Sequence, residues 1–272
     1  LAAADGEKWV FKGADCLPPN YEQCMVALSP GGGDATVYRE FNVVTKQWVE
    51  NGFALPLAKT TVSWRDADSL WVGTDFGPGS LTSSGYPRLA RLWMRGTPLA
   101  EATPVWEIPQ DWVGLGAYSL HNPEGRHDLI TTTPEFFRGH HYLILGDRKV
   151  KLDLPEDVSL QGIFKDRLLI SLRTDWTVGG ATYPQDSLLA IDIDDFLQGS
   201  RGFQTLFAPS ERVSLSGVAA TRDSLLLATL DNVRGRLYRL RPGDGAWTRE
   251  EIPLPGPGSA SFEATTDQRE MF

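Results

Sequence analysis

Short apolar runs separated by polar turns follow one another along the chain. A polar turn containing aspartate, followed by an apolar run of four to six residues, occurs at residues 66–72, 165–170 and 222–227 and begins again at Asp267. Apolar runs of this length, bounded by glycine, aspartate and proline, are typical of β-strands. The pattern therefore predicts a chain built from short strands.

The spacing of these turns predicts a repeated unit. Asp166 and Asp223 lie 57 positions apart, Asp223 and Asp267 lie 44 apart, and the 98 positions from Asp68 to Asp166 make two steps of about 49. The blades of β-propellers repeat at about 40–50 residues. Four strands can be read in each step, most clearly at 213–220, 225–230, 236–240 and 247–252. We therefore expect an all-β fold, a β-propeller of four-stranded antiparallel blades, with a pair of β-sandwiches as the alternative.

The pattern predicts one propeller domain over residues 1–272. Its blades are expected at about 8–50, 60–108, 112–154, 157–208 and 211–253, with a partial blade at 257–272. Both ends of the chain are interpreted as cuts through a larger ring. One helical turn is expected at 194–199, because this stretch starts with acidic residues and ends with glycine. Without helices between the strands, a parallel α/β sheet is excluded.

The net charge of the chain limits the kinds of partner it can bind, and its two cysteines bear on the cellular compartment. The chain has 35 Asp and Glu against 26 Lys and Arg, and an acidic surface repels nucleic acid and anionic membranes. Cys16 and Cys24 could close a small hairpin loop in an oxidising compartment. The favoured interpretation is two free thiols in a cytoplasmic protein, with the periplasm left open.

Motifs for catalysis and for metal or phosphate binding are missing from the sequence. It has no G-x-S-x-G nucleophile elbow, no G-x-x-x-x-G-K-[ST] phosphate loop and no H-E-x-x-H or paired-cysteine zinc pattern. All four histidines lie in the third unit and are interpreted as solvated loop residues: His121, His127, His140 and His141. We expect no catalytic residue, no metal and no cofactor in this chain.

Two aspartates occupy matching places in different blades. Asp75 and Asp175 each follow the second strand of their unit. A pair of carboxylates could support glycoside chemistry. The favoured interpretation is a capping role at the turn, with contact to a ligand or partner as the remaining possibility.

The loops that follow these aspartates are the longest hairpins in the chain. Residues 77–88 and 177–186 each include a Tyr-Pro pair near the end. Loops between the second and third strands of all blades emerge on one rim, and such loops commonly carry function. We expect this rim to gate substrate or to meet another domain, through Asp75, Phe76, Tyr86, Arg88, Arg173, Asp175, Trp176 and Tyr183.

Several hairpin sequences resemble a known family. Residues 24–34, continued by 37–43 and Trp48, resemble the first strand and turn of an early propeller blade in prolyl oligopeptidases. Further stretches resemble a bacterial branch of that family, at 73–77, 84–88, 93–97, 175–180 and 187–192. The similarity covers nearly the whole chain, which is therefore identified as resembling the N-terminal β-propeller domain of these serine peptidases.

The resemblance implies a parent protein with two domains. One is a seven-bladed propeller that caps the active site and admits short peptides, and the other is a C-terminal α/β-hydrolase domain with a Ser, Asp and His triad. The triad belongs to that second domain, which is absent from these 272 residues. Two alternatives stay open: a stand-alone propeller that acts as a protein-interaction scaffold, and a carbohydrate- or cofactor-active propeller that uses Asp75 and Asp175.

Overall fold

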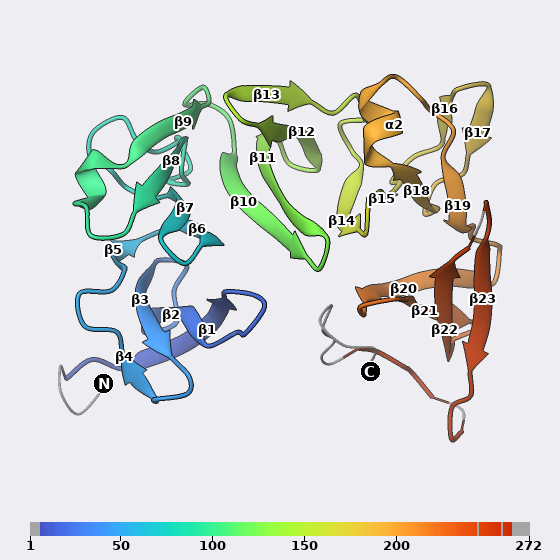
Figure 1. Cartoon of the computed structure of the whole chain (residues 1–272), viewed down its shortest axis with the longest axis horizontal. Helices are drawn as coiled ribbons and strands as arrows, with labels where there is room; N and C mark the ends of the chain where they lie inside the picture. Colours follow the sequence, from blue (N-terminus) through green and yellow to red (C-terminus); the bar gives the residue numbers. More distant parts are fainter. Residues whose placement is uncertain (1–5, 244, 257, 263–272) are drawn as a thin grey trace. The chain divides into compact units, whose positions relative to one another are not determined.

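The computed structural model describes residues 6–243, 245–256 and 258–262, and these fold into successive antiparallel sheets (Figure 1). In the described residues there are five sheets with four strands paired in chain order, the first of which has a fifth strand in addition, and a separate two-stranded hairpin lies between strands of the fourth. The predicted all-β fold of four-stranded antiparallel blades is confirmed. Two compact units divide the chain, one of residues 1–120 and 127–153 and the other of residues 121–126 and 154–272.

The first unit contains most of the first three sheets. The first sheet has β1 (Trp9–Cys16), β2 (Gln23–Pro30), β3 (Thr36–Asn42) and β4 (Gln47–Trp48), and β5 (Ala54–Ala58) also pairs with β3. The second has β6 (Thr61–Asp66), β7 (Ser69–Gly73), β8 (Leu89–Met94) and β9 (Thr103–Glu107), with a short 3₁₀ helix, η1 (Leu99–Glu101), before β9. The third has β10 (Gly114–Asn122), β11 (Gly125–Glu135), β12 (Arg138–Leu145) and β13 (Arg148–Lys151).

The second unit contains the fourth and fifth sheets. The fourth has β14 (Ser159–Phe164), β15 (Arg167–Ser171), β18 (Leu188–Asp192) and β19 (Gln204–Phe207), with helix α2 (Ile193–Leu197) after β18. Between β15 and β18 lies the hairpin of β16 (Trp176–Val178) and β17 (Ala181–Tyr183). The fifth has β20 (Val213–Ala220), β21 (Leu225–Asp231), β22 (Arg234–Pro242) and β23 (Trp247–Ile252).

Neighbouring sheets within a unit pack face to face because each second strand is apolar on both sides. In β7, Leu70 and Val72 enter one core cluster with Trp64, whereas Trp71 enters another with Ile130. Successive side chains of a strand point to opposite faces, so one apolar run contributes to two interfaces. The second unit has an equivalent cluster between its two sheets, made of Phe164, Leu169, Leu188, Ala190, Leu206, Phe207, Leu225, Leu227 and Leu240.

The helical prediction was close, but its start was wrong. Helix α2 begins at Ile193 because the side-chain oxygen of Asp192 accepts hydrogen bonds from the backbone N–H groups of Asp194 and Asp195. Such a cap satisfies donors that the first helical turn leaves without partners. Helix η1 and the paired strands β16 and β17, which lie around the expected loop at 177–186, were not expected from the sequence. Residues 257 and 263–272, in which a partial blade was expected, lie outside the described residues.

The interpretation of the two cysteines as free thiols was wrong. Cys16 ends β1 and Cys24 lies directly opposite it in β2, with the two Cα atoms 4.0 Å apart, and the sulfur atoms form a disulfide. The spacing of eight residues left pairing open, and the antiparallel register places the two side chains together. In the described part of the chain, no helix has the length and apolarity that crossing a bilayer requires.

Candidate functional site

The loop between β7 and β8 is held in shape by hydrogen bonds among its own residues and to the neighbouring strand β9. Asp75 accepts hydrogen bonds through Oδ1 from the Gly77 N–H at 2.8 Å and the Ser80 hydroxyl at 3.0 Å. Arg88 donates to the carbonyl oxygens of Gly79 at 2.7 Å and Ile108 at 2.9 Å. Its remaining guanidinium nitrogen pairs with Glu107. Asp75 therefore caps the loop, and Arg88 ties the loop to the outer part of the same sheet.

The aromatic residues of this loop differ in exposure. Phe76 packs beside the core and lies under the Arg91 guanidinium, which is 4.2 Å from the ring centroid. Tyr86 is 40% exposed, and the Lys59 ammonium lies 4.2 Å from its ring centroid. Among the four candidates of this loop, Tyr86 is therefore the one that offers its ring to a partner.

The loop between β15 and β18 is built around an aromatic cluster. Trp176 and Tyr183 face each other across the β16–β17 hairpin and both pack on Phe203, with ring centroids 5.1 Å and 6.0 Å from it. The Tyr183 hydroxyl donates to the Phe203 carbonyl at 3.2 Å. Asp175 accepts the Gln185 N–H at 2.7 Å, so it also acts as a loop cap.

The structure thus places the eight candidates in two loops of the same topological position, four in each. Asp75, Phe76, Tyr86 and Arg88 belong to the first unit, and Arg173, Asp175, Trp176 and Tyr183 belong to the second. In each loop most of these side chains hold the loop in shape. The two aspartates that suggested paired-carboxylate chemistry each bind donors of their own loop.

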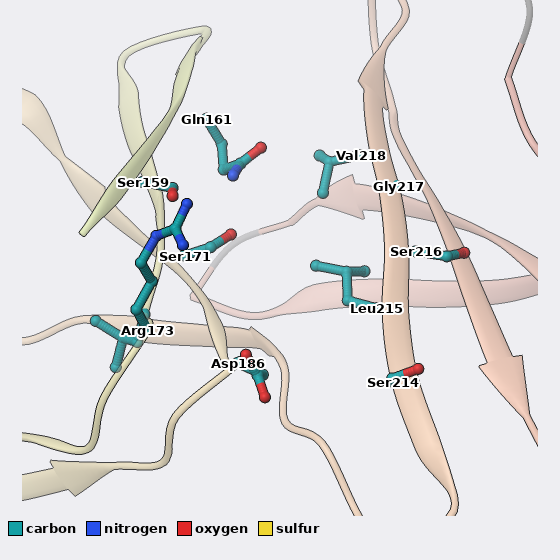
Figure 2. Close-up of a pocket in the computed structure, with 11 residues that line it drawn as sticks. Ser159, Gln161, Ser171, Arg173, Asp186, Ser214, Leu215, Ser216, Gly217 and Val218 are labelled. Carbon is teal, nitrogen blue, oxygen red and sulfur yellow. The ribbon is translucent and has the colours of Figure 1, made fainter. Parts of the chain in front are cut away.

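Arg173 differs from its neighbours because it lines a pocket (Figure 2). The pocket has a volume of about 480 Å³ and lies in the second unit, between the fourth and fifth sheets. Its lining combines polar residues with apolar ones and comprises Ser159, Gln161, Ser171, Leu172, Arg173, Asp186, Ser214, Leu215, Ser216, Gly217 and Val218. Only Arg173 among these was a candidate from the sequence. For Ser171 alone the sequence held a signal, the change from leucine to serine to arginine at alternate positions 169, 171 and 173.

The interpretation of the histidines as loop residues was wrong. All four lie in strands β10, β11 and β12, and His141 is buried. Its Nδ1 lies 3.0 Å from the Thr131 hydroxyl, which in turn lies 3.3 Å from the Tyr118 hydroxyl. Burial raises the pKa of Tyr118, and the hydrogen bond with Thr131 partly opposes this. Within the described residues, no group of three His, Cys, Asp or Glu side chains could hold a metal ion.

The chain is similar to peptidases over its whole described length. No protein-family model matches it. It is 30% identical to an uncharacterised peptidase of Sinorhizobium fredii, over 100% of this chain and 39% of the relative. It is also similar to the structure of a post-proline cleaving enzyme from Rickettsia typhi, with a TM-score of 0.87 and 25% identity, over 94% of this chain and 40% of that one.

A third similarity concerns the fold alone. The β-propeller domain of the trilobed protease from Pyrococcus furiosus matches with a TM-score of 0.54 and 13% identity, over 88% of this chain and 68% of that one.

The chain spans about two fifths of the length of the Sinorhizobium fredii relative and of the post-proline cleaving enzyme.

Proposed function

Because the chain belongs to the N-terminal β-propeller domains of the prolyl oligopeptidase family of peptidases, we propose that it is the non-catalytic domain of a serine peptidase. In this role it caps the active site and limits access to short peptides, including peptides that are cut after proline. The observation that carries the proposal is the similarity over the whole chain to peptidases more than twice its length. The sequence has no G-x-S-x-G elbow, so the triad would come from an α/β-hydrolase domain of the full-length protein.

We assign the β7–β8 loop of the first unit and the β15–β18 loop of the second unit, each by itself, to contact with the peptidase domain. Arg88 fixes the first loop through three partners, and Trp176 and Tyr183 fix the second on Phe203. A loop held in one conformation presents the same surface to every substrate. Closure of two domains over such a surface would exclude water and large proteins from the reaction.

Tyr86→Ala in the full-length protein is expected to lower kcat/KM for a proline-containing octapeptide by about 3–10-fold, because the exposed ring is lost from the proposed rim. The substitution should leave the fold unchanged, since the Tyr86 side chain is outside the core clusters. Initial rates at low substrate concentration measure the effect. Arg88→Ala and Trp176→Ala should also lower turnover, but they loosen their loops as well.

Met94→Ala is the matched control. Met94 is 44% exposed and ends β8, the strand whose other end follows the Tyr86 loop. Its kcat/KM should stay within twofold of the wild type. Equal activity of the Tyr86 variant and the wild type would refute the rim assignment, and absence of peptidase activity in the wild type would favour the scaffold alternative.

The Cys16–Cys24 disulfide leads us to propose an oxidising compartment such as the periplasm, in place of the cytoplasm expected from the sequence. Cells that make the full-length protein at its natural level should yield chains that take up no maleimide at these cysteines until they are reduced. Mass spectrometry of the peptide spanning residues 16–24 measures the label. Full labelling without reduction would contradict the periplasmic proposal.

A further inference from the structure

The turn between β11 and β12 carries two exposed aromatic residues. Glu135 pairs with Arg138, so Phe136 and Phe137 form a two-residue turn at the tip of this hairpin. Their side chains are 76% and 74% exposed. Single apolar side chains are common on protein surfaces, whereas two adjacent phenylalanine rings form an apolar patch of the kind that marks an interaction site.

The backbone of this turn does not favour an aromatic residue. Phe137 has a φ of +67°, in the left-handed region that glycine and asparagine adopt most readily. A bulky side chain in this region costs conformational energy. An exposed ring recovers little of that cost through burial, so the folding of the hairpin does not account for this residue.

The fifth sheet repeats this feature at the matching turn. Asn232 and Val233 form the two-residue turn between β21 and β22, and Val233 has a φ of +63° and is 88% exposed. Two-residue turns at the other ends of the strands, between β12 and β13 and between β14 and β15, place Gly146 and Lys165 in the left-handed region. Among these four turns, the exposed apolar residue therefore occurs where second and third strands join, the position that the β7–β8 and β15–β18 loops also occupy.

Hydrogen bonds within the first unit connect the β11–β12 hairpin to the β7–β8 loop. The linker between β9 and β10 lies between them. The Thr133 carbonyl, in a bulge of β11, accepts the Val113 N–H of this linker at 2.9 Å. On the other side, the Thr82 hydroxyl donates to the Val113 carbonyl at 3.3 Å, and the Ser83 N–H donates to the Gln110 carbonyl at 2.8 Å. The hairpin is therefore continuous with the loop that we assign to contact with the peptidase domain.

The charge of the tip and the length of the relatives favour that domain as the partner. Glu135 and Arg138 flank the two rings and pair with each other, with Nε and Oε2 3.8 Å apart, so the tip has no net charge. A tip that bound anionic lipid would carry an excess of basic residues. The chain spans 39% of the Sinorhizobium fredii relative, so a full-length protein of that size has ample further chain to cover the tip.

We propose that Phe136 and Phe137 form an anchor that enters an apolar pocket of the peptidase domain of the same chain. This inference rests on the proposed function, because it takes that domain as the partner. Aromatic side chains that enter a pocket of the partner commonly supply most of the affinity of an interface. The anchor would hold the hairpin, and with it the β7–β8 loop, against the peptidase domain when the two domains close.

The first test is photo-cross-linking of the full-length protein. The photoreactive amino acid p-benzoylphenylalanine is placed at position 136, and mass spectrometry of the irradiated and digested protein identifies the cross-linked peptides. We expect cross-links to peptides of the peptidase domain. The matched control carries the same amino acid at position 44, since Val44 is 65% exposed and lies in the β3–β4 turn, at the other end of the strands of the same unit. This control should give no cross-link to that domain.

The second test is hydrogen exchange in Phe136→Asp. Truncation of an interface anchor costs about 2 kcal/mol or more, which corresponds to a shift of about 30-fold in the equilibrium between open and closed domains. The segment that cross-links to position 136 should therefore exchange its amide hydrogens about 30-fold faster in this variant. Val44→Asp should leave the exchange of that segment unchanged, and far-UV circular dichroism checks that both variants fold.

Four results would overturn the proposal. They are no cross-link from position 136 to the peptidase domain, cross-links only to a second copy of the chain, equal cross-linking from position 44, and unchanged exchange in Phe136→Asp. Neither measurement needs turnover. An active peptidase without the cross-link would therefore refute the anchor alone, and an inactive protein with the cross-link would keep the anchor and refute the peptidase activity.

Discussion

Glu40→Ala is expected to lower the free energy of unfolding by about 3–5 kcal/mol, the range for removing one partner of a buried ion pair. The Glu40 side chain is fully buried and receives two hydrogen bonds from Arg95, at 2.9 Å and 3.0 Å. It also accepts the Phe53 backbone N–H at 2.8 Å. Alanine would leave that buried N–H without its acceptor, and it would leave the guanidinium with only the exposed Asp68 carboxylate, 3.6 Å away, as a counter-charge. Urea unfolding followed by circular dichroism measures the loss.

Glu107→Ala is the matched control for this prediction. Glu107 also pairs with an arginine, Arg88, but its side chain is 60% exposed. Ion pairs between exposed side chains contribute little, so this variant should lose less than about 1 kcal/mol. Similar losses in the two variants would mean that burial of the Glu40–Arg95 pair does not matter to stability.

The Glu40–Arg95 pair also shows what connects successive blades. Glu40 lies in β3 of the first sheet, and Arg95 follows β8 of the second. Arg95 further donates to the Ala67 carbonyl, at the turn between β6 and β7. One arginine therefore fixes the first sheet to a turn of the second through polar contacts.

Much of the fold could be predicted because the signals for it are local. The strand expected at 213–220 is the observed β20, and the turns with aspartate precede the buried second strands β7, β15 and β21. Alternation and turn residues act within a few positions, so a single sequence carries them. The start of α2 was missed by one residue because Asp192, Asp194 and Asp195 are all possible caps, and only the structure distinguishes them.

The parts that could not be predicted depend on contacts between distant residues. The disulfide needed the register of β1 and β2, and the burial of His141 needed the neighbours of β12. The candidate loops were found from their length and their glycines, but their internal bonds were not. The pocket needs Ser159 and Gln161 beside Leu215 and Val218, more than 50 positions later, and no local pattern indicates such a pairing.

Trp64→Ala is expected to cost about 3–5 kcal/mol, because it removes a large side chain that is only 1% exposed in the core between the first two sheets. The Trp64 indole N–H also donates to the Asp15 carbonyl at 2.9 Å, which ties β6 to the end of β1. Trp64→Phe keeps an aromatic ring and loses this bond, so it should cost less, about 1–2 kcal/mol. Urea unfolding followed by circular dichroism measures both variants, and equal losses would contradict the packing argument.

The effects of Trp64→Ala and Glu40→Ala should not add, because both residues contact Phe53. The Phe53 ring lies 5.8 Å from that of Trp64, the Arg95 guanidinium lies 4.5 Å from the same ring, and the Phe53 N–H binds Glu40. Residues that share a partner show coupling energies of about 0.5–3 kcal/mol in double-mutant cycles. The double variant should therefore lose less than the sum of the two single losses, since the first substitution already loosens Phe53. Additivity within about 0.3 kcal/mol would instead mean that the ion pair and the aromatic core stabilise this interface independently.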